Sequence, residues 1–558
     1  MSSFWLLDGR VDNATSLAEE CGVGTMNWAH SSAGLVTTLI RNCGAGVIRR
    51  FTGQFALALI DVAGGRVRLF RDCFGNRPLY YAAVGDGWAW ASEIKCLLPL
   101  LESVYLDIEG LAESIHYRWL AGDHTLIAGV YQVLPSTAVT LTAGSLPEEQ
   151  QYWRPQFQPE KPKAGIKFWV DAAEKALAAY FRALARQHEC IGVLLSGGWD
   201  SSLCAVMARR HARRCFAVTP RFPGRENSEL DQAQRVARLL DMPHRIVDCD
   251  DAFVAAAFPN LIWWLEGIPR AFSSFAFASI ITGVRNDCSA LVYGNAADAS
   301  WGPSECIQPC RYEKKQRWLR PVPRWVRKAM GCVLPTRPES LLARLRLLLL
   351  EPAEQFALRI DAVDYTRSPS LASRSVPAAP TPSEKAVRLF YGGSGGLVER
   401  FQTFHLYTCS VNHQRTLEHL AAPFNVDIEA PFCSPEMMDL AMRLPNEYKE
   451  EDGWTKPVLR RLACRFFPSD WIYAPKHGFP TPALAWFQGP LRSWTGLLAE
   501  ERCRQRSIFR ARALETMRLP GDMELMWTAM SLECFLRIFV DVPTALVPTG
   551  LNPIGIVN

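Results

Sequence analysis

The residues with the clearest chemical signature lie in the segment 194–202, LLSGGWDSS. It follows an apolar stretch of strand length and precedes a stretch typical of a helix, which is the setting that an anion-binding loop requires. Gly197 and Gly198 let the backbone approach a phosphate closely, and the start of the helix offers N–H groups and a partial positive charge. Three hydroxyl groups able to donate to phosphate oxygens belong to Ser196, Ser201 and Ser202. The pattern predicts a phosphate-binding loop.

Asp200 would repel a phosphate by itself, because like charges repel. It is reasonable as a ligand of Mg²⁺, which would bridge it to the phosphates. The loop is not a Walker A motif, since no Gly-Lys-Ser/Thr is present. It is similar to SGGxDSS, the pyrophosphate loop of N-type ATP pyrophosphatases, and this resemblance implies cleavage of ATP between its α and β phosphates. An ordinary glycine-rich turn is the competing interpretation, which Asp200 and the two serines after it disfavour.

The segments around this loop alternate between strand and helix patterns. Short apolar strands are expected at 191–195, 215–218, 245–247 and 291–293, and helices at 170–185, 202–210 and 228–240. Such alternation predicts a doubly wound parallel sheet. From about residue 403 the chain is expected to be mainly helical.

The first 155 residues differ, because short strands separated by glycine turns predict a β-rich unit. Gln54–Asp61 and Arg66–Phe70 flank Gly64-Gly65 as a hairpin, and a second pair at 79–81 and 88–92 repeats the pattern. A segment rich in Pro and Lys follows. We therefore expect one domain over residues 1–155 and another over 165–558, the latter with a linker rich in Ser, Pro and Ala at about 367–381.

Bulk composition restricts the class of protein. A chain of 558 residues is too long for one core, and its 49% hydrophobic and 21% charged residues are ordinary for a globular protein. The net charge of +5 argues against a dedicated nucleic-acid binder. The 17 cysteines are scattered singly without a CxxC pair, so we expect free thiols. The sequence has no signal-peptide pattern and no apolar run that could span a bilayer, so we expect a cytoplasmic protein.

Three further segments resemble the asparagine synthetase family over most of the chain. Arg71–Tyr81 (RDCFGNRPLYY) and Ala91–Lys95 (ASEIK) are similar to the RDxxGxxPLYY and ASExK segments of its N-terminal glutaminase domain. Tyr293–Asp298 (YGNAAD) stands where the family has SGEGSDE. Ala474–Phe479 (APKHGF) is similar to the segment with the family's active-site lysine, here Lys476. The resemblance implies an α/β protein with an Ntn-type glutaminase-like domain and an ATP-pyrophosphatase domain that has a helical C-terminal part.

The resemblance also implies roles for individual residues. Asp200 and Asp298 are expected to hold Mg²⁺, and Lys476 to stabilise the tetrahedral oxyanion and the AMP phosphate. The plainer alternatives are a loop cap for Asp298 and a solvated surface lysine for Lys476. ATP is expected to contact Leu194, Ser196, Gly197, Gly198, Asp200, Ser201, Ser202, Val218 and Gly294.

The departures from the family pattern change the expected reaction. The family's glutaminase nucleophile is a cysteine exposed after removal of Met1, and here Ser2 stands at that position. Asp8–Asn13 resembles the middle of a glutaminase domain, so we expect a truncated domain, a structural role for Cys21, and no use of glutamine as nitrogen donor. Asn295 stands where asparagine synthetases carry Glu, which disfavours asparagine synthesis.

Together these features, with the stretch 298–305, resemble the lasso-peptide cyclases within that family. The resemblance implies adenylation of an Asp or Glu side chain of a precursor peptide. The peptide's N-terminal amine then attacks, closing a macrolactam. A leader peptidase and a leader-recognition protein are the implied partners. Two alternatives stay open: a small-molecule amide synthetase of the asparagine or β-lactam kind, and an inactive peptide-binding scaffold.

The segment 311–328 is rich in basic and aromatic residues. It is either a binding surface for a peptide or partner protein, or a solvated amphipathic helix.

Overall fold

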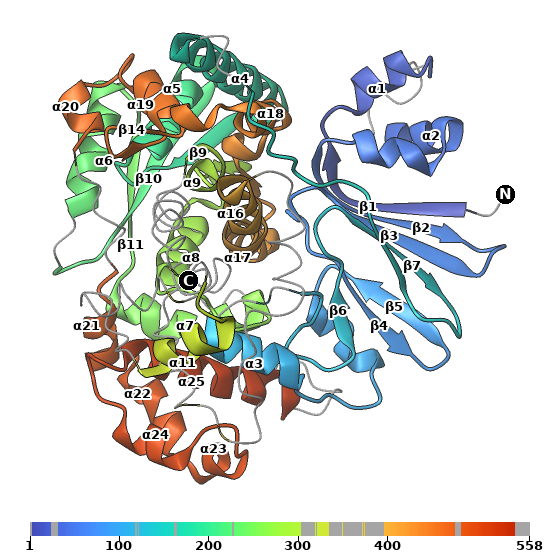
Figure 1. Ribbon diagram of the computed structural model, residues 1–558, viewed down its shortest axis with the longest axis vertical. Coiled ribbons are helices and arrows are strands. Elements are labelled where there is room, and N and C mark those ends of the chain that lie inside the picture. Colours follow the sequence, from blue (N-terminus) through green and yellow to red (C-terminus); the bar gives the residue numbers. More distant parts are fainter. Residues whose placement is uncertain are drawn as a thin grey trace. The chain divides into compact units, whose positions relative to one another are not determined.

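A computed structural model of the chain describes residues 3–23, 32–117, 120, 122–160, 165–225, 228–302, 319, 321–333, 349, 371, 373, 396–474 and 481–541. Two compact units make up the fold (Figure 1). One is formed mainly by Met1–Gly110 and Gly122–Pro155, and the other mainly by Gln156–Phe535.

The first unit contains two antiparallel sheets. The larger has the strand order β1-β2-β3-β7-β8 and the smaller the order β5-β4-β6. Their strands are β1 (Ser3–Val11), β2 (Gly53–Asp61), β3 (Arg66–Arg71), β4 (Tyr80–Val84), β5 (Gly87–Ala91), β6 (Val130–Gln132), β7 (Thr137–Thr142) and β8 (Glu148–Gln151). Both predicted hairpins are confirmed, β2 with β3 and β4 with β5.

Alternation along the strands divides the core of this unit between two layers. Ala56, Ala58 and Leu69 pack toward the smaller sheet, against Tyr81 among others. Residues of the opposite parity, such as Phe55 and Leu57, share a second cluster with the helices α1 (Ala14–Glu20) and α2 (Ser32–Cys43). The predicted β-rich character of this unit is thus confirmed.

The second unit is built on a five-stranded sheet with the order β11-β10-β9-β12-β13, in which every neighbouring pair is parallel. The strands are β9 (Cys190–Leu194), β10 (Arg214–Arg221), β11 (His244–Asp248), β12 (Ala290–Val292) and β13 (Asp427–Glu429). The predicted doubly wound sheet is confirmed, with β13 as an edge strand that the sequence patterns did not identify.

Helices cover this sheet, as Figure 1 shows for α4, α5 and α8. One large cluster of buried side chains joins the sheet to α4 (Ile166–Gln187), α5 (Trp199–His211) and α6 (Ser228–Leu239). The remaining longer helices are α3 (Ile108–Tyr117), α7 (Asp251–Leu265), α8 (Ser273–Val284), α11 (Arg324–Val333), α16 (Leu397–His405), α17 (Val411–Ala421), α18 (Pro435–Arg443) and α25 (Met523–Phe535). Short helices include α9 (Ala297–Ser300), α19 (Pro457–Ala463), α20 (Ser469–Ile472), α21 (Ala483–Gln488), α22 (Arg492–Thr495), α23 (Glu501–Gln505) and α24 (Ala511–Thr516).

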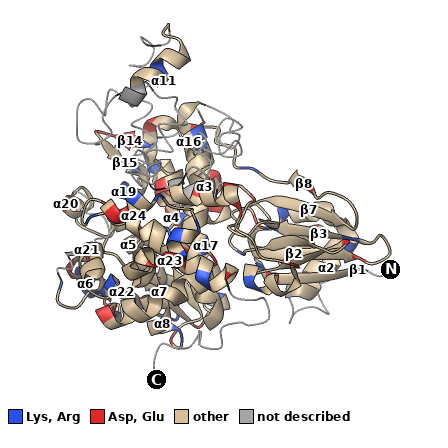
Figure 2. Cartoon of the chain, turned by 90° about the horizontal axis from the view of Figure 1, so that it is seen from below, with Lys and Arg blue, Asp and Glu red and all other residues tan. Residues whose placement is uncertain are grey.

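Several expectations concern residues outside the described ranges: the linker at 367–381, residues 303–305, most of 311–328, and Lys476. Within 311–328 the structure describes the start of α11, where Trp325 is 75% exposed. Basic and acidic residues are interspersed over the helices of the second unit (Figure 2). Among the described residues no helix has the length and apolar character needed to cross a membrane.

A half-buried histidine in the first unit should make stability depend on pH. The Nδ1 atom of His124 lies 3.4 Å from Asp107 Oδ2, and this hydrogen bond raises the pKa of His124 above its ordinary 6.5. The stabilisation is therefore complete below about pH 6.5 and is lost as pH rises through the raised pKa. We expect His124→Gln to lower stability in urea denaturation by about 0.5 kcal/mol at about pH 5.5 and by less at about pH 9. An equal loss at both pH values would contradict this assignment.

Candidate active site

Strand order locates the candidate site before any side chain is considered. From β9 the chain moves outward through β10 to β11, and then returns to the other side of β9 to form β12 and β13. The direction of winding therefore reverses between β9 and β12. In open α/β sheets ligands bind outside the carboxyl ends of the strands at such a switch point. Asp200 lies in the first turn of the helix after β9 and Asp298 in the first turn of the short helix after β12, so both predicted Mg²⁺ ligands come from this position.

The loop after β9 folds around its glycines and serines. Gly197 has φ +76°, and a Cβ atom there would lie 2.7 Å from Gln232 Cβ on α6, so only glycine fits. The Ser196 and Ser201 hydroxyls lie 3.1 Å apart, and Gly198 N–H donates to Ser196 Oγ over 3.3 Å. These contacts hold the loop in one conformation at the start of α5.

Ser202 does not line the pocket beside the loop, whereas Ser196 and Ser201 do. It is fully buried, and its hydroxyl donates to the Gly198 carbonyl over 2.9 Å. The pocket beside the loop is lined by Ser196, Gly198, Asp200 and Ser201, whereas Ser202 and Gly197 are not part of its wall. Both residues therefore shape the loop from behind, Gly197 by its close packing against α6 and Ser202 by its hydrogen bond to the carbonyl four residues earlier.

A lysine joins the two aspartates. Lys456 Nζ lies 2.8 Å from Asp200 Oδ2 and 2.5 Å from Asp298 Oδ1, and the lysine side chain is only 2% exposed. One ammonium group thus contacts both carboxylates, so the two oxygens are close enough to share a cation. This arrangement fits the expectation that Asp200 and Asp298 hold Mg²⁺, a cation that prefers oxygen ligands.

The local backbone conformation places Lys456 between the two aspartates. The strands β14 (Glu450–Glu451) and β15 (Trp454–Thr455) form a hairpin whose turn residues, Asp452 and Gly453, both have positive φ, as a type I′ turn requires. Lys456 follows directly with φ +58°, a conformation that costs a residue other than glycine about 1 kcal/mol. Ala296, which precedes the short helix of Asp298, is strained in the same way with φ +66°. Such strain is typical of functional sites.

An aromatic ring lies against the lysine ammonium group and is shared with a neighbouring arginine. Lys456 Nζ lies 4.2 Å from the centroid of the Trp199 ring, and the guanidinium carbon of Arg460 lies 5.0 Å from the same centroid. Arg460 also lies over Trp454, at 4.7 Å. Because the face of an aromatic ring attracts cations, Trp199 helps to hold the ammonium group beside the carboxylates.

A pocket of about 250 Å³ opens beside the loop. Its polar side is the loop with Asp298. Its apolar wall includes Phe277, which the sequence patterns did not identify, in edge-to-face contact with Tyr293 at 5.6 Å. The full lining is Leu194, Leu195, Ser196, Gly198, Asp200, Ser201, Val218, Pro220, Glu229, Phe277, Ile280, Tyr293, Gly294 and Asp298. A polar end beside an apolar wall suits a nucleotide, with phosphates at the loop and base at the wall.

Asn295 lies beside this pocket with its side chain fixed. It is 7% exposed, and its Nδ2 donates to the Ser410 carbonyl over 2.9 Å. Asparagine synthetases carry a Glu at this position, and its carboxylate has no N–H group to donate to that carbonyl. The Asn295 amide is thus held by a hydrogen bond that a carboxylate could not form.

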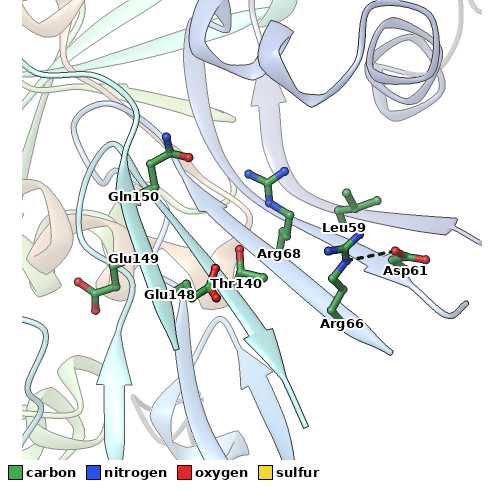
Figure 3. Close-up of a pocket in the computed structure, with 8 residues that line it drawn as sticks. All are labelled: Leu59, Asp61, Arg66, Arg68, Thr140, Glu148, Glu149 and Gln150. Atoms are coloured by element: carbon green, nitrogen blue, oxygen red, sulfur yellow. Dashed lines mark hydrogen bonds and ion pairs between the residues drawn. The ribbon is translucent and has the colours of Figure 1, made fainter. Parts of the chain in front are cut away.

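The first unit has a larger hollow of about 490 Å³ on its main sheet (Figure 3). It is lined by Leu59, Asp61, Arg66, Arg68, Thr140, Glu148, Glu149 and Gln150. Asp61 pairs with Arg66 at 3.3 Å across the turn of the β2–β3 hairpin. No cysteine or histidine is among its described lining residues. The candidate chemistry lies in the second unit, where Asp200, Asp298 and Lys456 converge.

Comparison with known proteins identifies the class of this site. The asparagine synthase family matches residues 172–537, and a glutamine amidotransferase domain matches residues 2–153. The chain belongs to the asparagine synthase family, whose members are ATP-dependent ligases that form amide bonds. This confirms the resemblance at the level of the family.

Three relatives show how similar this sequence is to those of known proteins. A putative asparagine synthetase (glutamine-hydrolyzing) of Mycobacterium tuberculosis is 28% identical over 476 residues, 81% of this chain and 70% of that protein. Asparagine synthetase (glutamine-hydrolyzing) 1 of Bacillus subtilis is 21% identical over 515 residues, 89% of this chain and 79% of that protein. The asparagine synthetase of Gallus gallus is 32% identical over 235 residues, 38% of each chain.

Removal of the lysine should expose the metal-binding capacity of the two aspartates. Without nucleotide, the Lys456 ammonium competes for the oxygens that a divalent ion would use. We expect Lys456→Met to bind Mn²⁺, a spectroscopic substitute for Mg²⁺, about tenfold more tightly than the wild type in an EPR titration. Arg461→Gln, on the same helix but in an exposed pair with Glu451, is the control. Unchanged Mn²⁺ affinity in Lys456→Met would refute the shared-cation interpretation.

The contact between Trp199 and Lys456 should be measurable as a coupling energy. A double-mutant cycle with Trp199→Leu and Lys456→Met, followed by urea denaturation, should give a coupling of about 0.5–2 kcal/mol. The cycle with Trp199→Leu and Arg461→Gln should be additive. Additivity in the first cycle would show that the ring contributes packing alone.

Proposed function

We propose that this protein is a lasso-peptide cyclase: it adenylates an Asp or Glu side chain of a precursor peptide, and the peptide's own N-terminal amine then attacks to form a macrolactam. The observation that supports the choice within the family is Asn295, a buried amide bonded to the Ser410 carbonyl where asparagine synthetases carry Glu.

The chemistry needs an activated carboxyl group, because a carboxylate and an amine do not condense at useful rates in water. In the proposed first step a carboxylate oxygen of the peptide attacks the α phosphorus of ATP, and the bond to the β-phosphate oxygen breaks, releasing pyrophosphate. In the second step the amine nitrogen attacks the acyl carbon, loses a proton, and displaces AMP. The sum is one amide bond formed for one ATP converted to AMP and pyrophosphate.

The residues of the site have separate parts in this proposal. The loop backbone with Ser196 and Ser201 binds the phosphates, and the apolar wall with Phe277 binds the base. Asp200 and Asp298 would hold Mg²⁺, which would neutralise negative charge on the departing pyrophosphate. Lys456, once released from the carboxylates, can move its ammonium group toward the same phosphates. Lys476 is proposed to stabilise the oxyanion of the second step.

Holding both reacting groups on one peptide raises their effective concentration greatly. The peptide must then be bound in a folded arrangement, with its tail inside the forming ring. We further propose that a leader peptidase and a leader-recognition protein deliver this peptide. Neither nucleic acid nor a membrane has a part in the proposed reaction.

A second candidate, ATP-dependent amide synthesis on a small molecule, has its own support. The relatives from Mycobacterium tuberculosis and Bacillus subtilis are named asparagine synthetases, and the amidotransferase domain matches residues 2–153. An inactive scaffold is less well supported, because the string from Ser196 to Ser202 is intact and Asp200, Asp298 and Lys456 converge.

One experiment separates these candidates. The enzyme is incubated with ATP, Mg²⁺ and a candidate precursor peptide, and nucleotides and peptide are followed by chromatography and mass spectrometry. The proposal predicts AMP, pyrophosphate and a peptide that has lost one water, with Asp200→Asn reducing all three by about 100-fold or more. An amidated amino acid formed from aspartate would support the small-molecule enzyme instead. Release of ADP and phosphate would contradict adenylation.

A further inference from the structure

A second group of ligand-type side chains lies in the same unit, apart from the nucleotide pocket. His188 is placed between the end of α4 and the start of β9, while Asp427 and Glu429 are the first and last residues of β13. One ligand atom from each of the three lies within 4.8 Å of the other two. None of the three is among the residues that line the nucleotide pocket.

Strand geometry brings the two carboxylates together. Asp427 and Glu429 are two residues apart on β13, so their side chains leave the same face of the sheet. In the parallel register Asp427 pairs with Ala290 and Glu429 with Val292 on β12. His188 approaches from the chain that enters β9, and its Nε2 lies 3.9 Å from Asp427 Oδ2.

Neighbouring hydroxyl groups orient these side chains. His188 Nδ1 lies 2.9 Å from Ser289 Oγ, which leaves Nε2 as the nitrogen directed at the carboxylates. Tyr180, on α4, donates a hydrogen bond from its hydroxyl to Glu429 Oε2. Metal-binding histidines and carboxylates characteristically have such outer partners, which fix the ring nitrogen and the oxygen used for coordination.

Burial makes the grouping costly without a cation. The side chains of Glu429 and His188 are 0% and 8% exposed, and that of Asp427 is 32% exposed. Two carboxylates this close repel each other, and the repulsion is stronger away from water. Tetrahedral ligands at about 2.0–2.2 Å from a metal ion lie about 3.3–3.6 Å apart, so an approach of the three ligand atoms by up to about 1.5 Å would complete a site.

We propose that His188, Asp427 and Glu429 bind a divalent transition-metal ion, with Zn²⁺ as the best match. An imidazole nitrogen with two carboxylates suits Zn²⁺, whereas Mg²⁺ prefers oxygen ligands alone. The ion would join the end of α4 to β13 and to the strand that leads into the phosphate loop. Its role is therefore structural, and the proposal is independent of the reaction proposed above.

The test uses the full chain, stripped with a chelator and titrated with Zn²⁺ against a chromophoric competitor. The wild type should bind one equivalent that Asp427→Asn and His188→Gln each weaken by about 100-fold or more. His211→Gln, which changes a histidine at the end of α5, and Asp298→Asn, at the nucleotide site, should retain it. Circular dichroism checks that each variant is folded, and the partly exposed Asp427 makes Asp427→Asn the safer of the two substitutions.

Co²⁺ substitution separates this site from the cysteines. The proposed ligands contain no sulfur, so the Co²⁺ protein should show d–d absorption that His188→Gln removes, without a thiolate charge-transfer band. Equal Zn²⁺ binding by the wild type and Asp427→Asn, or a tight site with a thiolate band, would overturn the proposal. So would the absence of any tight equivalent in the wild type.

Discussion

The candidate site depends on one electrostatic arrangement, in which the Lys456 ammonium group lies between the carboxylates of Asp200 and Asp298. Asp200 and Lys456 are largely removed from water, where an uncompensated charge is costly. The three groups therefore stabilise each other only as a set. Such a set can also exchange partners. A divalent ion can replace the ammonium group between the carboxylates, and a polyphosphate can replace the carboxylates beside the ammonium group.

The rest of the second unit can be understood as the means of bringing these groups together. The sheet reverses its winding between β9 and β12, so two loops distant in sequence open at one place. A tight hairpin places Lys456 opposite them, and both Lys456 and Ala296 adopt left-handed backbone conformations. The core shared by α4, α5, α18 and α19 holds the hairpin and the loop in one rigid body, which offsets that local strain.

The sequence allowed the sheet, the hairpins and the glycine-rich turn after β9 to be predicted, because each is encoded by neighbouring residues. The loop needs a strand, two glycines and a helix start in a row, and Asp200 is part of the same string. Lys456 could not be found in this way, since 256 residues separate it from Asp200 and its own neighbourhood predicts only a turn at Asp452-Gly453. The wall residue Phe277 looks like any core aromatic until the sheet order is known. The same locality explains why Ser202 was expected at the phosphates, although its hydroxyl donates to the Gly198 carbonyl behind the loop.

The most direct test of the central claim is a crystal structure of the protein with Mg²⁺ and a non-hydrolysable ATP analogue. The account predicts the triphosphate on the loop after β9, the metal bound by Asp200 and Asp298, and the Lys456 ammonium group moved from between the carboxylates to a phosphate oxygen. A nucleotide bound elsewhere, or a loop occupied while Lys456 still bridges both aspartates without a metal ion, would contradict it.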